Sequence, residues 1–109
     1  MIASDDVVSK ALAYLAIDPH PLALARKDLS DAEQNSKEVF ALALLAADGS
    51  VAVKEATATA HAAHSAAKGK EAEAQMEYER HRCRVKAAEM IIEIWRSENA
   101  NARAAERVR

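Results

Sequence analysis

Residues 50–109 read SVAVKEATATAHAAHSAAKGKEAEAQMEYERHRCRVKAAEMIIEIWRSENANARAAERVR, a run without proline and with a single glycine, Gly69. Alanine, glutamate, lysine, arginine, methionine and glutamine dominate it, and these are the strongest helix formers. Because the run takes up more than half of the 109-residue chain, the sequence predicts an all-α protein. We expect one helix from residue 51 to about residue 107, roughly 85 Å long at a rise of about 1.5 Å per residue.

The single glycine of this run leaves one alternative open. Gly69 costs about 1 kcal/mol relative to alanine in a helix interior, so a break there is the alternative to a continuous helix. Its neighbours Lys68 and Lys70 are not turn formers, and no second breaker stands beside it, which favours continuity. Small side chains line one face of the first half and predict close packing against the preceding helix: Ala52, Ala56, Ala60, Ala63 and Ala67.

The first 20 residues predict a short helix. Ser4 can cap its N-terminus, and Asp5 and Asp6 suit the positive end of the helix dipole. Asp18-Pro19 ends this helix, because the residue before a proline is pushed out of the helical region. One face carries the side chains that we expect to pack inward: Val8, Ala11, Leu12 and Leu15.

A second helix is expected from Pro21 to about Ala47, since proline is well placed at the first helical position. Ser30 begins a capping-box pattern, so a restart or a kink near this residue is the alternative. Gly49 suits the left-handed position after a helix, and Ser50 can cap the next helix. Spacings of three and four residues mark a coiled-coil-like seam at Leu22, Ala25, Leu29, Ala32, Ser36, Phe40, Ala43 and Ala47.

Together these elements predict a short N-terminal helix and a long antiparallel helical hairpin within a single domain, residues 1–109. The second helix spans about 40 Å and therefore reaches only to about residue 77 of the long helix. The C-terminal arm overhangs in a coiled-coil-like manner, and its apolar side chains need another partner. We expect a homo-oligomer, foremost a dimer, that forms through Val85, Met90, Ile91, Ile92, Ile94 and Trp95.

Charge is divided unevenly along the chain. Residues 1–79 carry a net charge of −6, and residues 80–109 carry a net charge of +4. Like charges four residues apart destabilise a helix, so the basic residues require an anionic partner. Acids of another chain, between residues 71 and 79, are one such partner, and nucleic-acid phosphates are the other. The basic residues concerned are Arg80, Arg82, Arg84, Lys86, Arg96, Arg103 and Arg107.

The residues capable of chemistry do not form a recognisable site. His61 and His64 are expected on one helix face, but His81 and Cys83 lie about 200° apart around a helix and cannot share a metal ion. We expect Cys83 to be a packed small residue rather than a nucleophile. The sequence therefore predicts no catalytic, metal or cofactor site and no small-molecule substrate, and we expect the protein not to be an enzyme.

Cys83 is the only cysteine, which excludes an internal disulfide and fits a reducing compartment. The N-terminus lacks the basic segment of a secretory signal. The longest apolar stretch, residues 39–47, falls far short of the ~20 residues that span a bilayer. We therefore expect a cytoplasmic protein with no membrane partner.

Residues 78–101, YERHRCRVKAAEMIIEIWRSENAN, combine a tyrosine, alternating arginines, an amphipathic turn and Trp-Arg-Ser. This stretch resembles the end of small helical proteins encoded by bacteriophages and prophages, which generally have no assigned activity. Some of them are similar to genes found near phage recombination functions. The architecture and this resemblance lead us to expect a non-enzymatic, oligomeric accessory protein that acts as a protein–protein adaptor or scaffold. The alternative is a nucleic-acid-associated factor of phage DNA recombination or metabolism that uses the basic C-terminal third.

Overall fold

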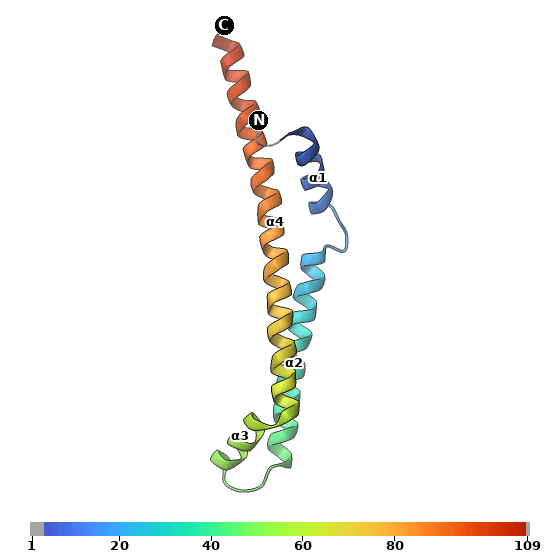
Figure 1. The fold of residues 1–109 in the computed structure, drawn as a ribbon, viewed down its shortest axis with the longest axis vertical. Coiled ribbons are helices and arrows are strands. Elements are labelled where there is room, and N and C mark those ends of the chain that lie inside the picture. Colours follow the sequence, from blue (N-terminus) through green and yellow to red (C-terminus); the bar gives the residue numbers. More distant parts are fainter. Residues whose placement is uncertain (1–3, 109) are drawn as a thin grey trace. The chain divides into compact units, whose positions relative to one another are not determined.

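The computed structural model describes residues 4–108, and every regular element within this range is a helix, which confirms the predicted all-α class. The four helices are α1 (Asp5–Leu15), α2 (Pro21–Ala46), α3 (Val51–Ala60) and α4 (Ala62–Val108), as labelled in Figure 1. α2 continues through Ser30 without a restart. None of these helices carries an apolar stretch long enough to cross a membrane.

The predicted helix from 51 to about 107 is wrong in one respect, because it is interrupted at His61. This residue has an extended backbone (φ −63°, ψ 134°) and separates α3 from α4. Its Nδ1 accepts a hydrogen bond from the backbone N–H of Ala63 at 3.1 Å, so the imidazole caps the start of α4. Since His61 lies outside the helix, the expectation that His61 and His64 share one helix face is also wrong.

A second histidine has the same role at the start of α2. The Nδ1 atom of His20 accepts a hydrogen bond from the backbone N–H of Leu22 at 3.0 Å. Both imidazoles thus satisfy one of the N–H groups that have no acceptor within the first turn of a helix. Serine, threonine, aspartate and asparagine are the usual N-caps, which is why neither histidine stands out as a helix start in the sequence.

Replacing His61 by alanine should therefore destabilise the protein by about 1 kcal/mol, the typical cost of losing an N-cap acceptor. His61→Asn is the matched control, because an asparagine side chain can accept the same hydrogen bond and should keep the stability. Chemical denaturation followed by circular dichroism measures both variants. Equal stability of His61→Ala and the unmodified protein would contradict the capping role.

Gly69 lies inside α4, which confirms that the helix continues through it. A Cβ atom added at this position would meet no atom within 4 Å beyond the adjoining residues and backbone of its own helix, so there is room for an alanine side chain. We expect Gly69→Ala to stabilise the protein by about 0.5–1 kcal/mol, because glycine loses more backbone entropy than alanine on entering a helix. The test is thermal unfolding, in which a lower melting temperature for the variant would count against this interpretation.

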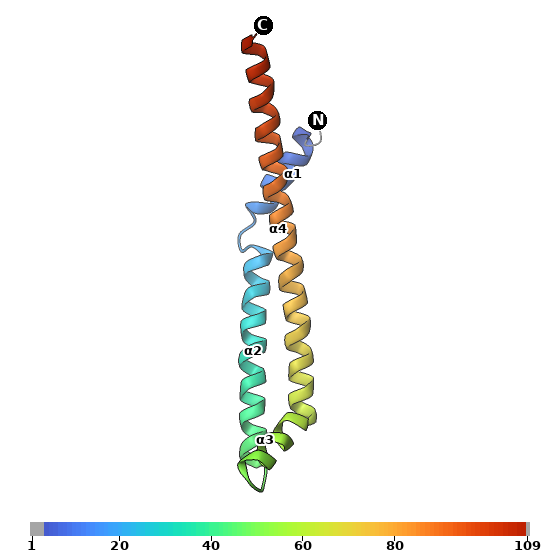
Figure 2. The same ribbon diagram turned by 90° about the vertical axis from the view of Figure 1, so that its left-hand side faces the viewer.

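The contacts of the chain group into two compact units, Ala23–Glu79 and the residues up to Leu22 together with those from Arg80 onward. In the Ala23–Glu79 unit, α2 and the first part of α4 run side by side (Figures 1 and 2). Arg26 Nη1 donates a hydrogen bond to Tyr78 Oη at 3.2 Å, and the rings of Phe40 and His64 lie 5.1 Å apart. Because the earlier α2 residue contacts the later α4 residue, the two helices are antiparallel, as predicted for the hairpin.

The seam predicted for α2 is confirmed, since all of its positions from Leu22 to Ala47 are buried or half-buried. Ser36 lies in the middle of the seam, is 3% exposed, and donates a hydrogen bond to the Glu71 carboxylate. Lys68, whose Nζ lies 3.2 Å from Glu71 Oε2, and this Ser36 hydroxyl hold the pKa of Glu71 below its usual range. The Ser36–Glu71 contact connects α2 to α4, whereas the Lys68–Glu71 ion pair lies within α4.

The alanine face predicted for residues 52–67 is wrong except at its last member. Ala67 is 4% exposed, whereas Ala52, Ala56, Ala60 and Ala63 are all exposed. The interruption at His61 changes the direction of the chain, so a spacing counted through it no longer describes one face. In α3 the buried side chain is instead Ala58, which is 0% exposed. At the start of α3, Gly49 has a φ of 112° and Ser50 caps the helix, both as predicted.

In the other unit, α1 lies against the part of α4 that follows Arg80 (Figures 1 and 2). Its core consists of Ala11, Ala88 and Ile92, with Tyr14, Leu15 and Ile91 packed around them. Ser4 caps α1 by accepting a hydrogen bond from Val7 N–H, as predicted. Val8 and Ala11 are buried as expected, but Leu12 is 52% exposed, so its predicted inward position is wrong.

Two polar contacts fix the pairing of α1 with α4. The guanidinium of Arg84 lies 4.8 Å from the centre of the Tyr14 ring, a cation–π contact. Nearer the other end of α1, Trp95 Nε1 donates a hydrogen bond to Asp5 Oδ1 at 3.3 Å. The later α1 residue contacts the earlier α4 residue, so this pair is antiparallel as well.

Candidate functional site

The apolar cluster predicted as an oligomer interface falls into two groups of residues. Ile92 is 9% exposed and belongs to the core with α1, and Val85, Ile91 and Trp95 are half-buried. Met90 and Ile94 are 57% and 36% exposed. The short helix α1 therefore covers more of the cluster than the sequence suggested, and the surface available to a partner is narrower than predicted.

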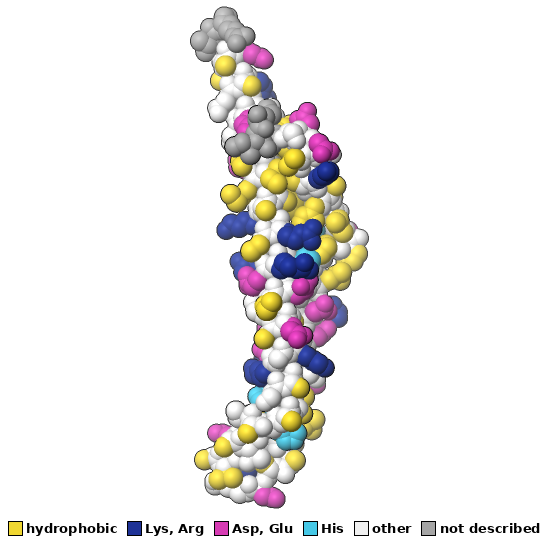
Figure 3. All heavy atoms as spheres, in the orientation of Figure 1, with side chains coloured by type: hydrophobic (Ala, Val, Ile, Leu, Met, Phe, Trp, Pro, Cys, Tyr) yellow, Lys and Arg dark blue, Asp and Glu magenta, His cyan; other side chains and the backbone are white. Residues whose placement is uncertain are grey.

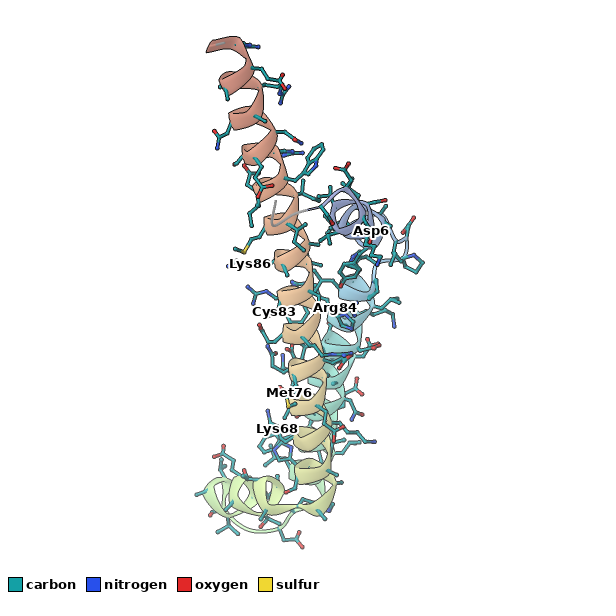
Figure 4. All side chains as sticks on the ribbon, turned by 45° about the horizontal axis from the view of Figure 1, so that its top comes forward. Asp6, Lys68, Met76, Cys83, Arg84 and Lys86 are labelled. Atoms are coloured by element: carbon teal, nitrogen blue, oxygen red, sulfur yellow. The ribbon has the colours of Figure 1, made fainter. Side chains whose placement is uncertain are left out.

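Met90 and Ile94 belong to an exposed row on α4. Cys83, Ala87, Met90 and Ile94 follow one another at spacings of four, three and four residues, which places them on one helix face. We call these four residues the α4 stripe, and all four are exposed. Figure 4 shows Cys83 on the side of α4 away from α1, whereas Arg84 points toward α1. The prediction that Cys83 is packed is wrong within a single chain, because its neighbours on this face are uncovered.

An open apolar groove borders the α4 stripe on the side of α1. It has a volume of about 330 Å³, and Ala87 belongs both to its lining and to the stripe. On the face drawn in Figure 3, apolar side chains gather over α1 and the neighbouring part of α4. Val7, on the α1 side of the groove, is 38% exposed. The residues that line the groove are Val7, Lys10, Ala11, Tyr14, Arg84, Ala87, Ala88 and Ile91.

The opposite border of the α4 stripe is charged. Lys86 precedes Ala87 by one residue and Glu93 precedes Ile94 by one residue, so both lie along the same edge of the stripe. Both side chains are exposed, and Figure 4 shows Lys86 on the side of α4 away from α1. The stripe thus has one apolar border formed with α1 and one border with a basic and an acidic residue.

The basic residues of the C-terminal third do not form an uninterrupted patch. On the α4 face that carries Arg82, Lys86 and Arg96, the same helical spacing also places Glu89 and Glu93. Lys and Arg side chains are interspersed with Asp and Glu on the face shown in Figure 3. Glutamates therefore separate the basic residues along the α4 face that carries Arg82, Lys86 and Arg96.

Most of these basic residues have contacts within the chain. Arg84 is placed over Tyr14, and Arg80 and Arg82 also take part in interactions. Arg103 Nε donates to the backbone carbonyl of Asn99 at 3.4 Å, and Arg96 Nη1 lies 3.9 Å from Glu93 Oε2. Lys86 and Arg107 are exposed. The repulsion between neighbouring arginines is thus relieved in part by contacts within one chain.

The histidines and the cysteine are spread over separate places. His20 and His61 cap helices, and His64 packs beside Phe40. Among residues 4–108, no group of three or more histidine, cysteine, aspartate or glutamate side chains is arranged to hold a metal ion.

Comparisons of the chain with models of known families, with curated proteins and with solved structures found no match. The geometry by itself defines the class: an all-α protein in which α2 and α4 form an antiparallel hairpin. A short helix packs on the later part of α4 and leaves the α4 stripe exposed. Val8 and Ala11 indicated an inward face of α1, but the sequence did not show how much of the apolar cluster on α4 this helix covers.

Proposed function

We propose that the protein is a non-enzymatic helical accessory protein that self-associates through α4 and acts as an adaptor or scaffold. The observation that carries this proposal is the exposure of Met90 and Ile94 in one row on α4, beside an apolar groove. Clustered exposed apolar side chains bordered by polar residues are typical of protein–protein interaction surfaces.

Self-association through the α4 stripe would cover the apolar side chains that α1 leaves exposed. A helix with an apolar row at coiled-coil spacing buries that row against another helix. α1 already occupies the adjacent face of α4, so the remaining apolar side chains of this unit need a second molecule. The free thiol of Cys83 would be shielded from solvent by the same contact.

The main competing function is binding to nucleic acid through the basic residues, and a salt titration separates the two. Phosphate contacts make affinity fall steeply with rising salt, whereas an apolar helix interface depends on salt only weakly. We expect a labelled DNA duplex to show no steep salt-dependent binding at micromolar protein concentration. The triple variant Arg96→Glu/Arg103→Glu/Arg107→Glu should leave self-association intact.

The opposite pattern would overturn the proposal in favour of a nucleic-acid-associated factor. In that case the duplex binds with a steep salt slope, and the triple charge reversal abolishes this binding. Arg103→Lys is the matched control, because it keeps the charge and should preserve any phosphate contact.

A further inference from the structure

We propose that two copies of the chain pair in an antiparallel orientation, with the α4 stripe of one copy packed against the α4 stripe of the other. This inference rests on the proposed self-association and adds the relative orientation of the two copies and the residues that meet. Two independent features of the surface carry it: the order of side-chain sizes along the stripe, and the difference between its two borders.

The order of sizes makes the stripe complementary to its own reverse. Read along the helix, two small side chains, Cys83 and Ala87, are followed by two larger ones, Met90 and Ile94. An antiparallel pair centred between residues 88 and 89 places Ala87 against the partner's Met90 and Cys83 against the partner's Ile94. Each layer then combines a small and a large side chain, which gives close packing without voids.

A parallel pair would stack equal side chains instead. Met90 would meet the partner's Met90, and Ala87 would meet the partner's Ala87 one turn away. The alanine layer would leave a gap beside the bulky methionine layer, and empty space in an interface forfeits dispersion contacts. The size order therefore favours the antiparallel orientation.

The two borders of the stripe point to the same orientation. A two-fold axis perpendicular to α4 brings like borders together, so Lys86 faces the partner's Glu93 and Glu93 faces the partner's Lys86. The symmetric contact therefore contains two lysine–glutamate pairs, each of which joins opposite charges. On the other side, the groove with Val7 and Ile91, which also contains Lys10 and Arg84, faces the same groove of the partner.

The parallel orientation brings unlike borders together. Lys86 would then lie against the partner's Ile91, beside the apolar groove, where burying an unpaired charge is unfavourable. Glu93 would face the partner's Glu98, a pair of like charge at flanking coiled-coil positions. Both consequences disfavour the parallel pair.

Disulfide mapping distinguishes the two orientations, because Cys83 is the only native cysteine. In the antiparallel pair the two Cys83 residues are offset by about 16 Å along the axis, far beyond the ~7 Å limit between Cα atoms for a disulfide. The unmodified protein should therefore stay unlinked on mild oxidation at concentrations where it is dimeric. In the variant Ile94→Cys, Cys83 should link to residue 94 of the second copy, as shown by peptide mapping under non-reducing conditions.

The control is Cys83→Ala/Ile94→Cys, which should remain unlinked in the antiparallel pair. Rapid linkage of Cys83 to Cys83 in the unmodified protein, or of residue 94 to itself in the control, overturns the orientation but leaves self-association standing. A monomeric mass under reducing conditions overturns self-association itself. The experiment therefore distinguishes a wrong orientation from a lack of self-association.

A charge reversal provides a second measurement that needs no cysteine. Glu93→Lys should weaken the antiparallel dimer several-fold in Kd, because it places two lysines opposite each other at both symmetric positions. The same change should strengthen a parallel dimer, since the new lysine would face the partner's Glu98. Adding Lys86→Glu to Glu93→Lys should restore the affinity, and a tighter dimer for Glu93→Lys alone overturns the antiparallel pair.

Discussion

The double variant Met90→Asp/Ile94→Asp is expected to be monomeric while keeping its helical content. Both side chains are exposed in a single chain, at 57% and 36%, so the fold of one copy does not depend on burying them. In the dimer, each new carboxylate would enter an apolar layer without a cationic partner, and such burial costs several kcal/mol. We expect Kd to rise by more than ~100-fold, since about 1.4 kcal/mol corresponds to a factor of ten.

The matched control is Leu42→Asp/Leu45→Asp on α2, where the leucines are 67% and 82% exposed. These substitutions add the same two charges at apolar positions that lie outside the α4 stripe. Light scattering across a concentration series should show a dimer for the control and a monomer for the Met90/Ile94 variant. If both double variants associate as tightly as the unmodified protein, the α4 stripe is not the interface.

The second large effect is expected at the contact between α1 and α4. Ile92 is 9% exposed and packs with Ala11 and Ala88. Ile92→Ala should destabilise the protein by about 2 kcal/mol, the lower end of the range for such truncations, because this core is small and open at its sides. Ile92 helps to hold α1 against α4. We therefore expect the truncation to release α1 from α4 before the other helices unfold.

Trp95 provides a direct readout of this loss. It is the only tryptophan, and its Nε1 donates a hydrogen bond to Asp5 of α1. Release of α1 should expose the indole to water, shift its emission to longer wavelength and lower the melting temperature. Leu45→Ala, at a position 82% exposed, is the control and should change stability by less than about 0.5 kcal/mol. An unchanged emission spectrum in Ile92→Ala would contradict the assigned role of this core.

The α2 seam shows what could be predicted from the sequence. Its positions follow a regular spacing of three and four between two clear boundaries, Pro21 and Gly49, and the structure buries or half-buries all of them. The continuity of α4 through Gly69 follows for a similar reason, since strong helix formers on both sides outweigh one glycine. Local propensity and periodicity decide such features, so they can be read without knowing the tertiary contacts.

The interruption at His61 and the exposure of Cys83 could not be predicted from propensity and periodicity. The interruption before α4 depends on an imidazole that accepts a backbone hydrogen bond, and no propensity scale identifies histidine as a cap. Whether Cys83 is covered depends on which face of α4 receives α1, a choice made by side chains about 70 residues away in the chain. The same choice separates Ile92, which is buried, from Met90 and Ile94, which are exposed.

We expect a second copy of the chain to cover the exposed α4 stripe. Sedimentation equilibrium of the unmodified protein at micromolar concentration, under reducing conditions, measures this association. The chain has a mass of 11.8 kDa, and we expect a species of twice this mass that persists at high salt. A mass of 11.8 kDa across the whole concentration range would contradict it.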